Sequence, residues 1–238
     1  MQPPISKRLA AEMIGTFGFF LTGFMGITAL TTQGPLSIQA IGIAAGFGFG
    51  LALMIFAFGQ VSGGHFNPAV TLGLTCAGKH PVKELVPYWV AQIVGGLLAS
   101  LLLLALYSQE IVGATVNAPG RGVGTGETFV LELVFTALFL LVIATVATDK
   151  RAPWSGVFAP FAIGLFIFTA FVVSGTITGA SLNPGRSLAS AVVAGDFANI
   201  WIYLLAPLVG GVIGGLLHML FSEPDGLTEF QDITTDGA

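Results

Sequence analysis

Two Asn-Pro pairs are the residues of this 238-residue chain whose types and spacing point most directly to chemistry. Asn67-Pro68-Ala69 and Asn183-Pro184-Gly185 each follow a glycine-containing segment and precede a short apolar stretch. Asparagine is favoured at the N-cap of a helix and proline at its first position, so each pair predicts a helix start. A helix start offers unpaired backbone N–H groups, a partial positive charge and the amide hydrogens of the asparagine. The two starts can therefore hold a small polar molecule through its oxygen atom.

The composition places these helix starts inside a membrane protein. Hydrophobic residues make up 54% of the chain and charged residues 8%, whereas soluble domains carry about 25% charged residues. Six apolar segments have close to the roughly 20 residues that a membrane-spanning helix needs. They lie at about 9–30, 38–60, 85–107, 127–148, 157–175 and 199–221. Because these runs are continuously apolar, without the alternation of a membrane β-strand, we predict an all-α membrane protein.

The apolar stretches that follow Asn67 and Asn183 have only about 10 residues each, which is too short to cross a membrane. We therefore predict two re-entrant half-helices, and the irregular backbone beside them must be buried or line water. The spans leave no room for a separate catalytic domain. Residues 1–222 are predicted to form a single transmembrane channel domain, and residues 223–238 an acidic, disordered cytoplasmic tail.

The chain contains an internal repeat, covering about 9–107 and about 127–221. Three landmarks occur twice, in the same order and at nearly constant separation: Glu12 and Glu132, the two Asn-Pro pairs, and the segments 88–96 and 203–211. Since each unit has three spans, the second unit enters the membrane upside down. The half-helices then enter from opposite faces and their N-termini meet near the midplane. Glu12 and Glu132 are predicted to be buried acceptors that hold the re-entrant backbone.

The basic residues indicate the orientation in the membrane. They precede the first span and lie between spans two and three and between spans four and five: Lys7, Arg8, Lys79, Lys83, Lys150 and Arg151. These segments all fall on one side, and the positive-inside rule makes that side the cytoplasm. Both termini are therefore predicted to be cytoplasmic. Short termini and compact loops favour a plasma or inner cell membrane, and an organelle membrane is the alternative location.

Several classes of function have no support in the sequence. The single Cys76 and the scattered His65, His80 and His218 do not have the spacing of metal ligands, so we expect no metal and no cofactor. There is no basic patch for nucleic acid. No nucleophile, base and orienting group fall together, so we do not predict an enzyme.

Residues 62–70 and 181–187, together with Glu12 and Glu132, resemble the aquaporin and glycerol-facilitator family, and the resemblance covers all six spans. Gly185 departs from the family, which usually has alanine there, and the lost methyl group is expected to loosen helix packing slightly. The resemblance implies a homotetramer in the lipid bilayer, with one pore in each subunit. The sequence itself shows only many small residues on the helices, which is consistent with close packing.

The resemblance also implies which residues line the pore. A selectivity filter would consist of Phe47, Phe171, Ala180 and Arg186. Pore-lining carbonyl groups would come from Gly63, Gly64, His65, Phe66, Gly179, Ala180, Ser181 and Leu182. An arginine near the membrane centre costs on the order of 3 kcal/mol on insertion scales, so Arg186 is a functional candidate by default.

The residues of the predicted filter match neither the pattern of water-selective members of the family nor that of glycerol-conducting members. Water-selective members of the family usually carry histidine where Phe171 stands, and glycerol-conducting members usually carry an aromatic residue where Ala180 stands. Ser187 and Tyr203 resemble those of water channels, whereas Leu204 is more like that of a glycerol channel. We predict a passive water channel that excludes protons and ions. Glycerol, hydrogen peroxide or ammonia are alternative solutes, and a secondary transporter or a structural junction protein are alternative classes. Gating stays open.

Overall fold

The computed structural model describes residues 3–31, 36–149, 151 and 157–222, and within these ranges it contains helices and no strands. The long helices are α1 (Ile5–Thr31), α2 (Leu36–Ser62), α4 (Leu85–Leu106), α6 (Thr125–Thr148), α7 (Ala159–Thr178) and α9 (Ile200–Phe221). The short ones are α3 (Pro68–Cys76), the 3-10 turn η1 (Val82–Glu84), α5 (Gln109–Gly113) and α8 (Pro184–Ala194). Lys150 and the predicted tail at 223–238 lie outside the described residues.

Six of the described helices are long and apolar enough to cross a membrane. Their apolar parts are Ile5–Thr28, Ala40–Ser62, Val82–Leu106, Thr125–Thr148, Ala159–Thr178 and Ile200–Phe221. They agree with the predicted spans to within a few residues at each end. The predicted all-helical architecture with six spans and two half-helices is therefore confirmed.

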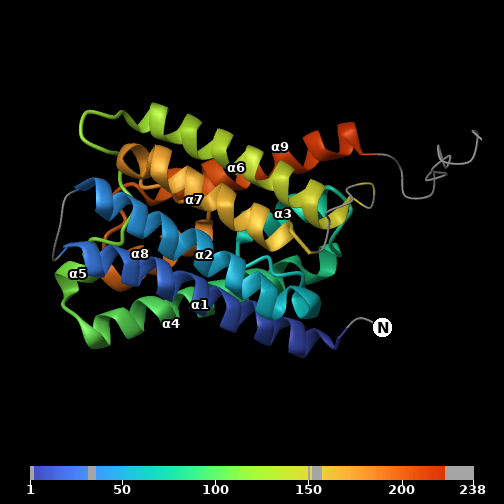
Figure 1. Ribbon diagram of the computed structural model, residues 1–238, viewed down its shortest axis with the longest axis horizontal. Coiled ribbons are helices and arrows are strands. Elements are labelled where there is room, and N and C mark those ends of the chain that lie inside the picture. The colour runs from blue at the N-terminus through green and yellow to red at the C-terminus, as the bar shows by residue number, and fades with distance from the viewer. Residues whose placement is uncertain (1–2, 32–35, 150, 152–156, 223–238) are drawn as a thin grey trace, which may run out of the picture.

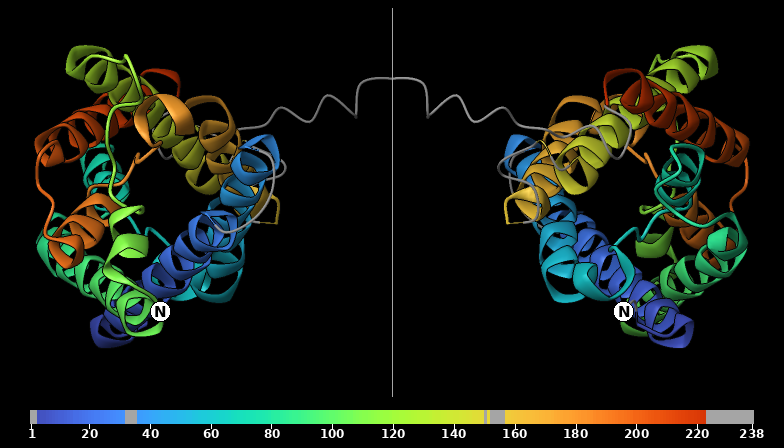
Figure 2. Two further views of the ribbon diagram at one scale, coloured as in Figure 1. Left: turned by 90° about the vertical axis from the view of Figure 1, so that its left-hand side faces the viewer. Right: turned by 90° about the vertical axis from the view of Figure 1, so that its right-hand side faces the viewer.

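The six long helices run side by side and form a ring when the molecule is seen end-on (Figures 1 and 2). Helix α1 packs against α2 and α4, and in the same way α6 packs against α7 and α9. Helices α2 and α7 contact each other across the two repeats. In Figure 1, α1 and α6 begin at opposite ends of the molecule, as two inverted repeats require.

Each half-helix packs against the last long helix of the other repeat, α3 against α9 and α8 against α4. Glycines at matching places in the repeats make this close approach possible. A Cβ added at Gly211 would lie 2.5 Å from the carbonyl oxygen of Ala69, and one at Gly96 would lie 3.0 Å from the Cβ of Ala189. Gly96 and Gly211, which end the repeated segments 88–96 and 203–211, therefore allow the long helices to pack closely against the half-helices.

Polar groups are buried inside the ring while apolar side chains are exposed on its outside. Large apolar side chains such as Leu53, Leu165 and Leu220 are exposed, whereas Glu12 and Glu132 are fully or almost fully buried. A bilayer supplies no hydrogen bonds to the outer face, so buried polar groups must find their partners within the protein. The centre of the ring is consequently where the hydrogen-bonding groups collect.

Candidate functional site

Both Asn-Pro pairs form capped helix starts. Asn67 is the N-cap of α3, where its Oδ1 accepts a hydrogen bond of 2.8 Å from the backbone N–H of Ala69. Asn183 is the N-cap of α8, where its Oδ1 accepts bonds of 2.9 and 3.2 Å from Gly185 and Arg186. In both helices proline occupies the first turn, where its missing N–H costs no hydrogen bond.

The two asparagines also connect the repeats. Nδ2 of Asn67 donates to the carbonyl of Leu182 at 2.8 Å, and Nδ2 of Asn183 donates to the carbonyl of Phe66 at 3.0 Å. A primary amide has two N–H groups, so each asparagine keeps a second donor after this bond. The two carbonyls likewise each keep a lone pair. The helix starts are therefore held face to face, with a spare donor on each.

The loops that precede the half-helices adopt an unusual backbone conformation. Phe66, Ala180 and Leu182 have positive φ angles of 48, 45 and 51°, although none of them is glycine. Such a conformation costs of order 1–3 kcal/mol per residue and persists only where surrounding contacts impose it.

Glu12 and Glu132 supply those contacts. Glu12 accepts hydrogen bonds from the backbone N–H of His65 at 3.0 Å and of Phe66 at 2.8 Å. Glu132 accepts equivalent bonds from Ser181 at 2.9 Å and Leu182 at 2.8 Å. The two carboxyl groups thus occupy equivalent places in the two repeats, and each fixes the loop of its own repeat.

Two tyrosines complete this framework, and this structural role was not predicted for them from the sequence. The hydroxyl of Tyr88 donates to the carbonyl of Ser62 at 2.9 Å, and that of Tyr203 donates to Thr178 at 2.7 Å. Each bond fixes the last residue of the helix that leads into a re-entrant loop. Their matching positions in the two repeats were the signal that could have identified this role.

Phe47, Phe171 and Arg186 come together beside the asparagines. The rings of Phe47 and Phe171 are stacked with centroids 4.2 Å apart and an interplanar angle of 16°. The guanidinium of Arg186 lies 5.5 Å from the ring centroid of Phe47 and 5.7 Å from that of Phe24. The fourth residue of the predicted filter, Ala180, is fully buried, and its part in the filter stays a prediction.

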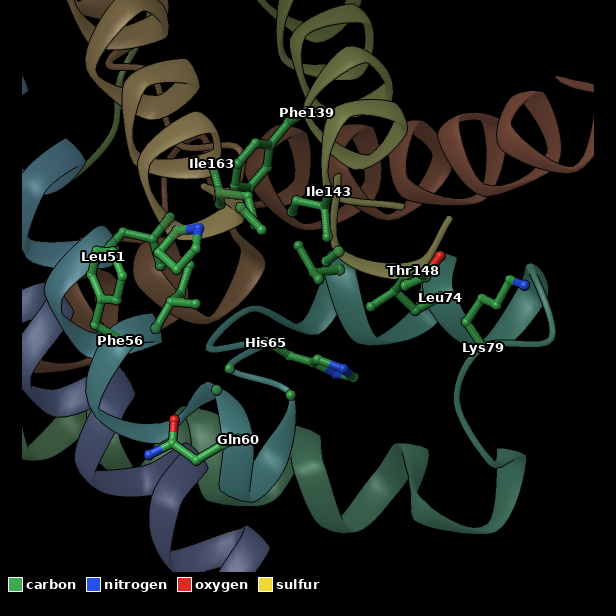
Figure 3. A pocket seen from close by; sticks show the side chains of 18 residues that line it. Leu51, Phe56, Gln60, His65, Leu74, Lys79, Phe139, Ile143, Thr148 and Ile163 are labelled. Carbon is green, nitrogen blue, oxygen red and sulfur yellow. The ribbon is translucent and has the colours of Figure 1, made fainter. Parts of the chain in front are cut away.

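Three cavities follow one another through the ring. The His65 cavity, of about 460 Å³, is lined by Gln60, His65 and Lys79 among others (Figure 3). The next, called here the constriction, has a volume of only about 10 Å³. Its lining includes Phe47, His65, Asn67, Phe171, Asn183 and Arg186. The third, the Asn117 cavity, measures about 390 Å³.

The cavities share lining residues, so they lie next to one another in a row, called here the path. His65 lines both the His65 cavity and the constriction. Phe171 and Arg186 line both the constriction and the Asn117 cavity. The path is therefore wide at both ends and narrow where the half-helix starts meet the stacked rings.

Asn117 is a member of the site that sequence reasoning missed. It lies in the connection between α5 and α6, and its Nδ2 donates to the carbonyl of Gly179 at 3.0 Å. Its Oδ1 accepts hydrogen bonds from Arg186 Nη1 and, at 2.7 Å, from Ser187 Oγ. No local periodicity marks this residue, because its partners lie far along the chain.

A cluster of rings borders the His65 cavity. His80, in the connection between α3 and η1, has its ring centroid 4.8 Å from that of His65 and 4.5 Å from that of Tyr88. Burial and then the nearby His65 imidazole lower the pKa of His80 to about 4, so it is neutral at pH 7. Arg8 and Glu84 form a two-contact ion pair close by, at 2.5 and 2.8 Å. Within the described residues, no group of three metal-ligating side chains occurs.

Comparisons with known proteins agree with this geometry. A model of the family described as "Major intrinsic protein" matches residues 1–218. The chain is 37% identical over 231 residues to Aquaporin Z of Photorhabdus laumondii, covering 91% of this chain and 98% of that protein. It is 32% identical over 240 residues to Aquaporin NIP1-2 of Arabidopsis thaliana, covering 99% of this chain and 80% of that protein.

A solved structure is also similar. The aquaglyceroporin from Plasmodium falciparum superposes with a TM-score of 0.81 at 25% identity, covering 91% of this chain and 96% of that chain. The family match spans nearly the whole chain, and the relatives match it over most of their own length. This chain therefore belongs to the major intrinsic protein family, the aquaporin family of membrane channels.

Proposed function

We propose that this protein is a passive channel for water that excludes protons and ions. The observation that carries the proposal is the constriction, whose volume of about 10 Å³ is close to the space that one water molecule needs. Asn67 and Asn183 both line it, each with one amide N–H left over. Water passing this point must move in single file and down its osmotic gradient.

The paired asparagines account for proton exclusion. A water molecule between the two helix starts accepts hydrogen bonds from both amides through its oxygen, so both lone pairs are occupied. It cannot then accept a hydrogen bond from a neighbouring water. Since a proton hops along a chain of waters in which each one donates to the next, the chain is broken here. The two helix dipoles place positive potential at the same point and oppose the entry of cations.

Arg186 adds to the exclusion of cations. Its side chain is 3% exposed and lines the constriction. A cation passing about 4 Å from the guanidinium, at an effective dielectric constant near 20, meets roughly 4 kcal/mol of repulsion. A barrier of that height slows passage on the order of a thousandfold. Neutral water does not meet this barrier.

Small neutral solutes are the second candidate substrates, because the constriction is bordered by the apolar ring pair of Phe47 and Phe171. An apolar border makes few hydrogen bonds, which weakens its interaction with water and admits small neutral solutes such as ammonia or hydrogen peroxide. Glycerol is larger than the constriction, so its passage requires the rings to separate. Phe171 is the residue on which this choice of solute depends.

We also infer the setting of the channel. The ion pair between Arg8 and Glu84 joins two basic segments at one end of the ring, which supports a cytoplasmic location for that end and for both termini. Residues 1–222 then form one channel unit in a cell membrane. The apolar outer faces are suited to lipid and to subunit contacts, and we propose a homotetramer with one pore per subunit.

Stopped-flow light scattering on proteoliposomes tests the choice of solute. Under a sucrose gradient we expect fast shrinkage, and under a glycerol gradient we expect shrinkage with no rapid re-swelling. Phe171→His restores a donor beside Arg186 and should increase water permeability without admitting glycerol. Re-swelling in glycerol at a rate comparable to that of shrinkage would instead assign the protein to solute conduction. Uptake driven by a proton gradient would assign it to the secondary transporters.

A further inference from the structure

The guanidinium of Arg186 is held by very few contacts. Among the described residues, Asn117 Oδ1 is the only hydrogen-bond acceptor for its side chain, and its Nε is buried without a partner. The guanidinium also lies over the rings of Phe24 and Phe47. An aromatic face attracts a cation but allows it to slide, because the attraction is not directional. The position of the charge across the path therefore depends on Asn117.

Asn117 is itself firmly fixed. It is 4% exposed, its oxygen accepts two hydrogen bonds and its nitrogen donates one to the carbonyl of Gly179. The loop that carries it is joined to α7 by a bond of 2.8 Å from Gly120 N–H to the carbonyl of Ile177. A single amide thus joins this loop, the end of α7 and the first turn of α8.

The chemical type of this residue matters as much as its place. An aspartate at 117 would have no N–H for the Gly179 carbonyl, and its negative charge would pair directly with Arg186. Glu132 accepts its hydrogen bonds from Thr178, Ser181 and Leu182, and none from the guanidinium. The neutral amide of Asn117 therefore holds the arginine without cancelling its positive charge.

We propose that Asn117 is a positioning residue that fixes the charge of Arg186 at the constriction, so that exclusion of cations depends on an amide at this position. The inference rests on the proposed channel function and assigns a part of it to the loop that joins the two repeats. Ion exclusion then depends on the Asn117 side chain, whose Oδ1 accepts the hydrogen bond from Arg186 Nη1.

The test compares Asn117→Asp and Asn117→Ala with Gln109→Ala in proteoliposomes. Gln109 is a matched control, since it also bonds this loop region to α8, through the carbonyls of Val193 and Ala194, without touching Arg186. We expect both Asn117 variants to raise sodium flux roughly tenfold or more. This increase is smaller than the roughly thousandfold one expected if the guanidinium charge were removed altogether. The ratio of sodium flux to water permeability should therefore rise in both Asn117 variants, because the repulsion from the guanidinium acts on a cation and not on a neutral molecule. Gln109→Ala should match the wild type in both measurements.

A double variant separates positioning from general loosening. If Asn117 acts through the arginine, Asn117→Ala combined with Arg186→Ala should leak no more sodium than Arg186→Ala alone. Additive leaks would overturn the proposal. So would an unchanged sodium flux in Asn117→Asp, whose similar size guards against a simple folding defect.

The rate of chemical modification of Arg186 tests the inference without a measurement of sodium or water flux. Phenylglyoxal modifies accessible arginine side chains, and mass spectrometry can follow its reaction at Arg186. Release of the guanidinium in Asn117→Ala should speed modification several-fold relative to Gln109→Ala, whereas equal rates would refute the positioning role. If wild-type liposomes conduct no water but the modification rates differ, the proposed function fails and the positioning of Arg186 stands.

Discussion

The buried carboxyl groups of Glu12 and Glu132 show how single residues determine the shape of the path. Each accepts two backbone N–H bonds from a loop whose residues adopt positive φ angles. Leaving a buried donor unpaired costs about 1–3 kcal/mol, so each carboxyl group offsets a substantial share of its loop's strain. The strained loops are in turn what carry Asn67 and Asn183 to the constriction.

Glu132→Ala tests this role. It leaves the Ser181 and Leu182 N–H groups without their acceptor and removes the shorter hydrogen bond of the Thr178 hydroxyl, and should cost roughly 3 kcal/mol or more. The melting temperature of the detergent-solubilised protein should fall by roughly 6 °C or more. Glu127→Gln, on the same helix but exposed, is the control and should cost under about 1 kcal/mol. Equal melting temperatures for the two variants would contradict the account.

Phe171→Ala tests the ring pair. It removes one of two stacked rings that border the constriction, and glycerol permeability should rise roughly tenfold or more, which corresponds to a barrier lowered by about 1.4 kcal/mol. The control is Phe166→Ala, which removes a ring on the same helix that stacks on Phe139 and does not line the constriction. If both variants exclude glycerol as the wild type does, the rings do not set the size limit.

His80 predicts a dependence of stability on pH. Its pKa is about 4 in the folded protein, below the ordinary value near 6.5. Between these two pH values the His80 imidazole binds more protons in the unfolded chain than in the folded protein. The contribution of neutral His80 to the free energy of unfolding is therefore complete above pH 6.5 and is lost as the pH falls toward 4. The loss of melting temperature between pH 7 and pH 5 should be smaller in His80→Phe than in the wild type. Identical losses would mean that other groups control the acid response.

At the scale of elements, the two half-helices meet more tightly than their sequences indicate. We expected the glycine of Asn183-Pro184-Gly185 to loosen packing slightly, because the family usually has alanine there. In the structure, a Cβ at Gly185 would lie only 3.2 Å from Cδ of Pro68 and 3.3 Å from Oδ1 of Asn183. A methyl group at this position would therefore be in tight contact with Pro68, and the start of the other half-helix would have to move by a few tenths of an ångström.

Gly185→Ala should therefore destabilise the protein, by about 1–3 kcal/mol as in other overpacked cores. Gly126→Ala is an informative control, because Gly126 lies in helix α6 with nothing within 4 Å of an added Cβ. Its replacement should stabilise by up to about 1 kcal/mol through helix propensity. Thermal melts of the two variants should move in opposite directions from the wild type. A Gly185 variant as stable as the wild type would mean that the half-helices can separate without cost.

At the scale of the whole molecule, much of the fold could be predicted from the sequence. Hydrophobic runs and the repeat of Glu12 and Glu132 predict six spans and an inverted arrangement, because both signals are local or periodic. Asn117 could not be found this way, since its three partners lie far along the chain and no pattern connects them. The stacking of Phe47 on Phe171 was equally hidden, because side-chain rotamers depend on packing across α2 and α7.

The central claim is that one path conducts water while it breaks the chain of proton transfer. The most direct measurement records shrinkage and internal pH together, in proteoliposomes that contain a pH-sensitive dye and face a sucrose gradient and a proton gradient. We expect shrinkage much faster than in empty liposomes, with internal acidification no faster than in empty liposomes. Proton entry that rises with the amount of protein, or shrinkage no faster than without protein, would contradict the claim.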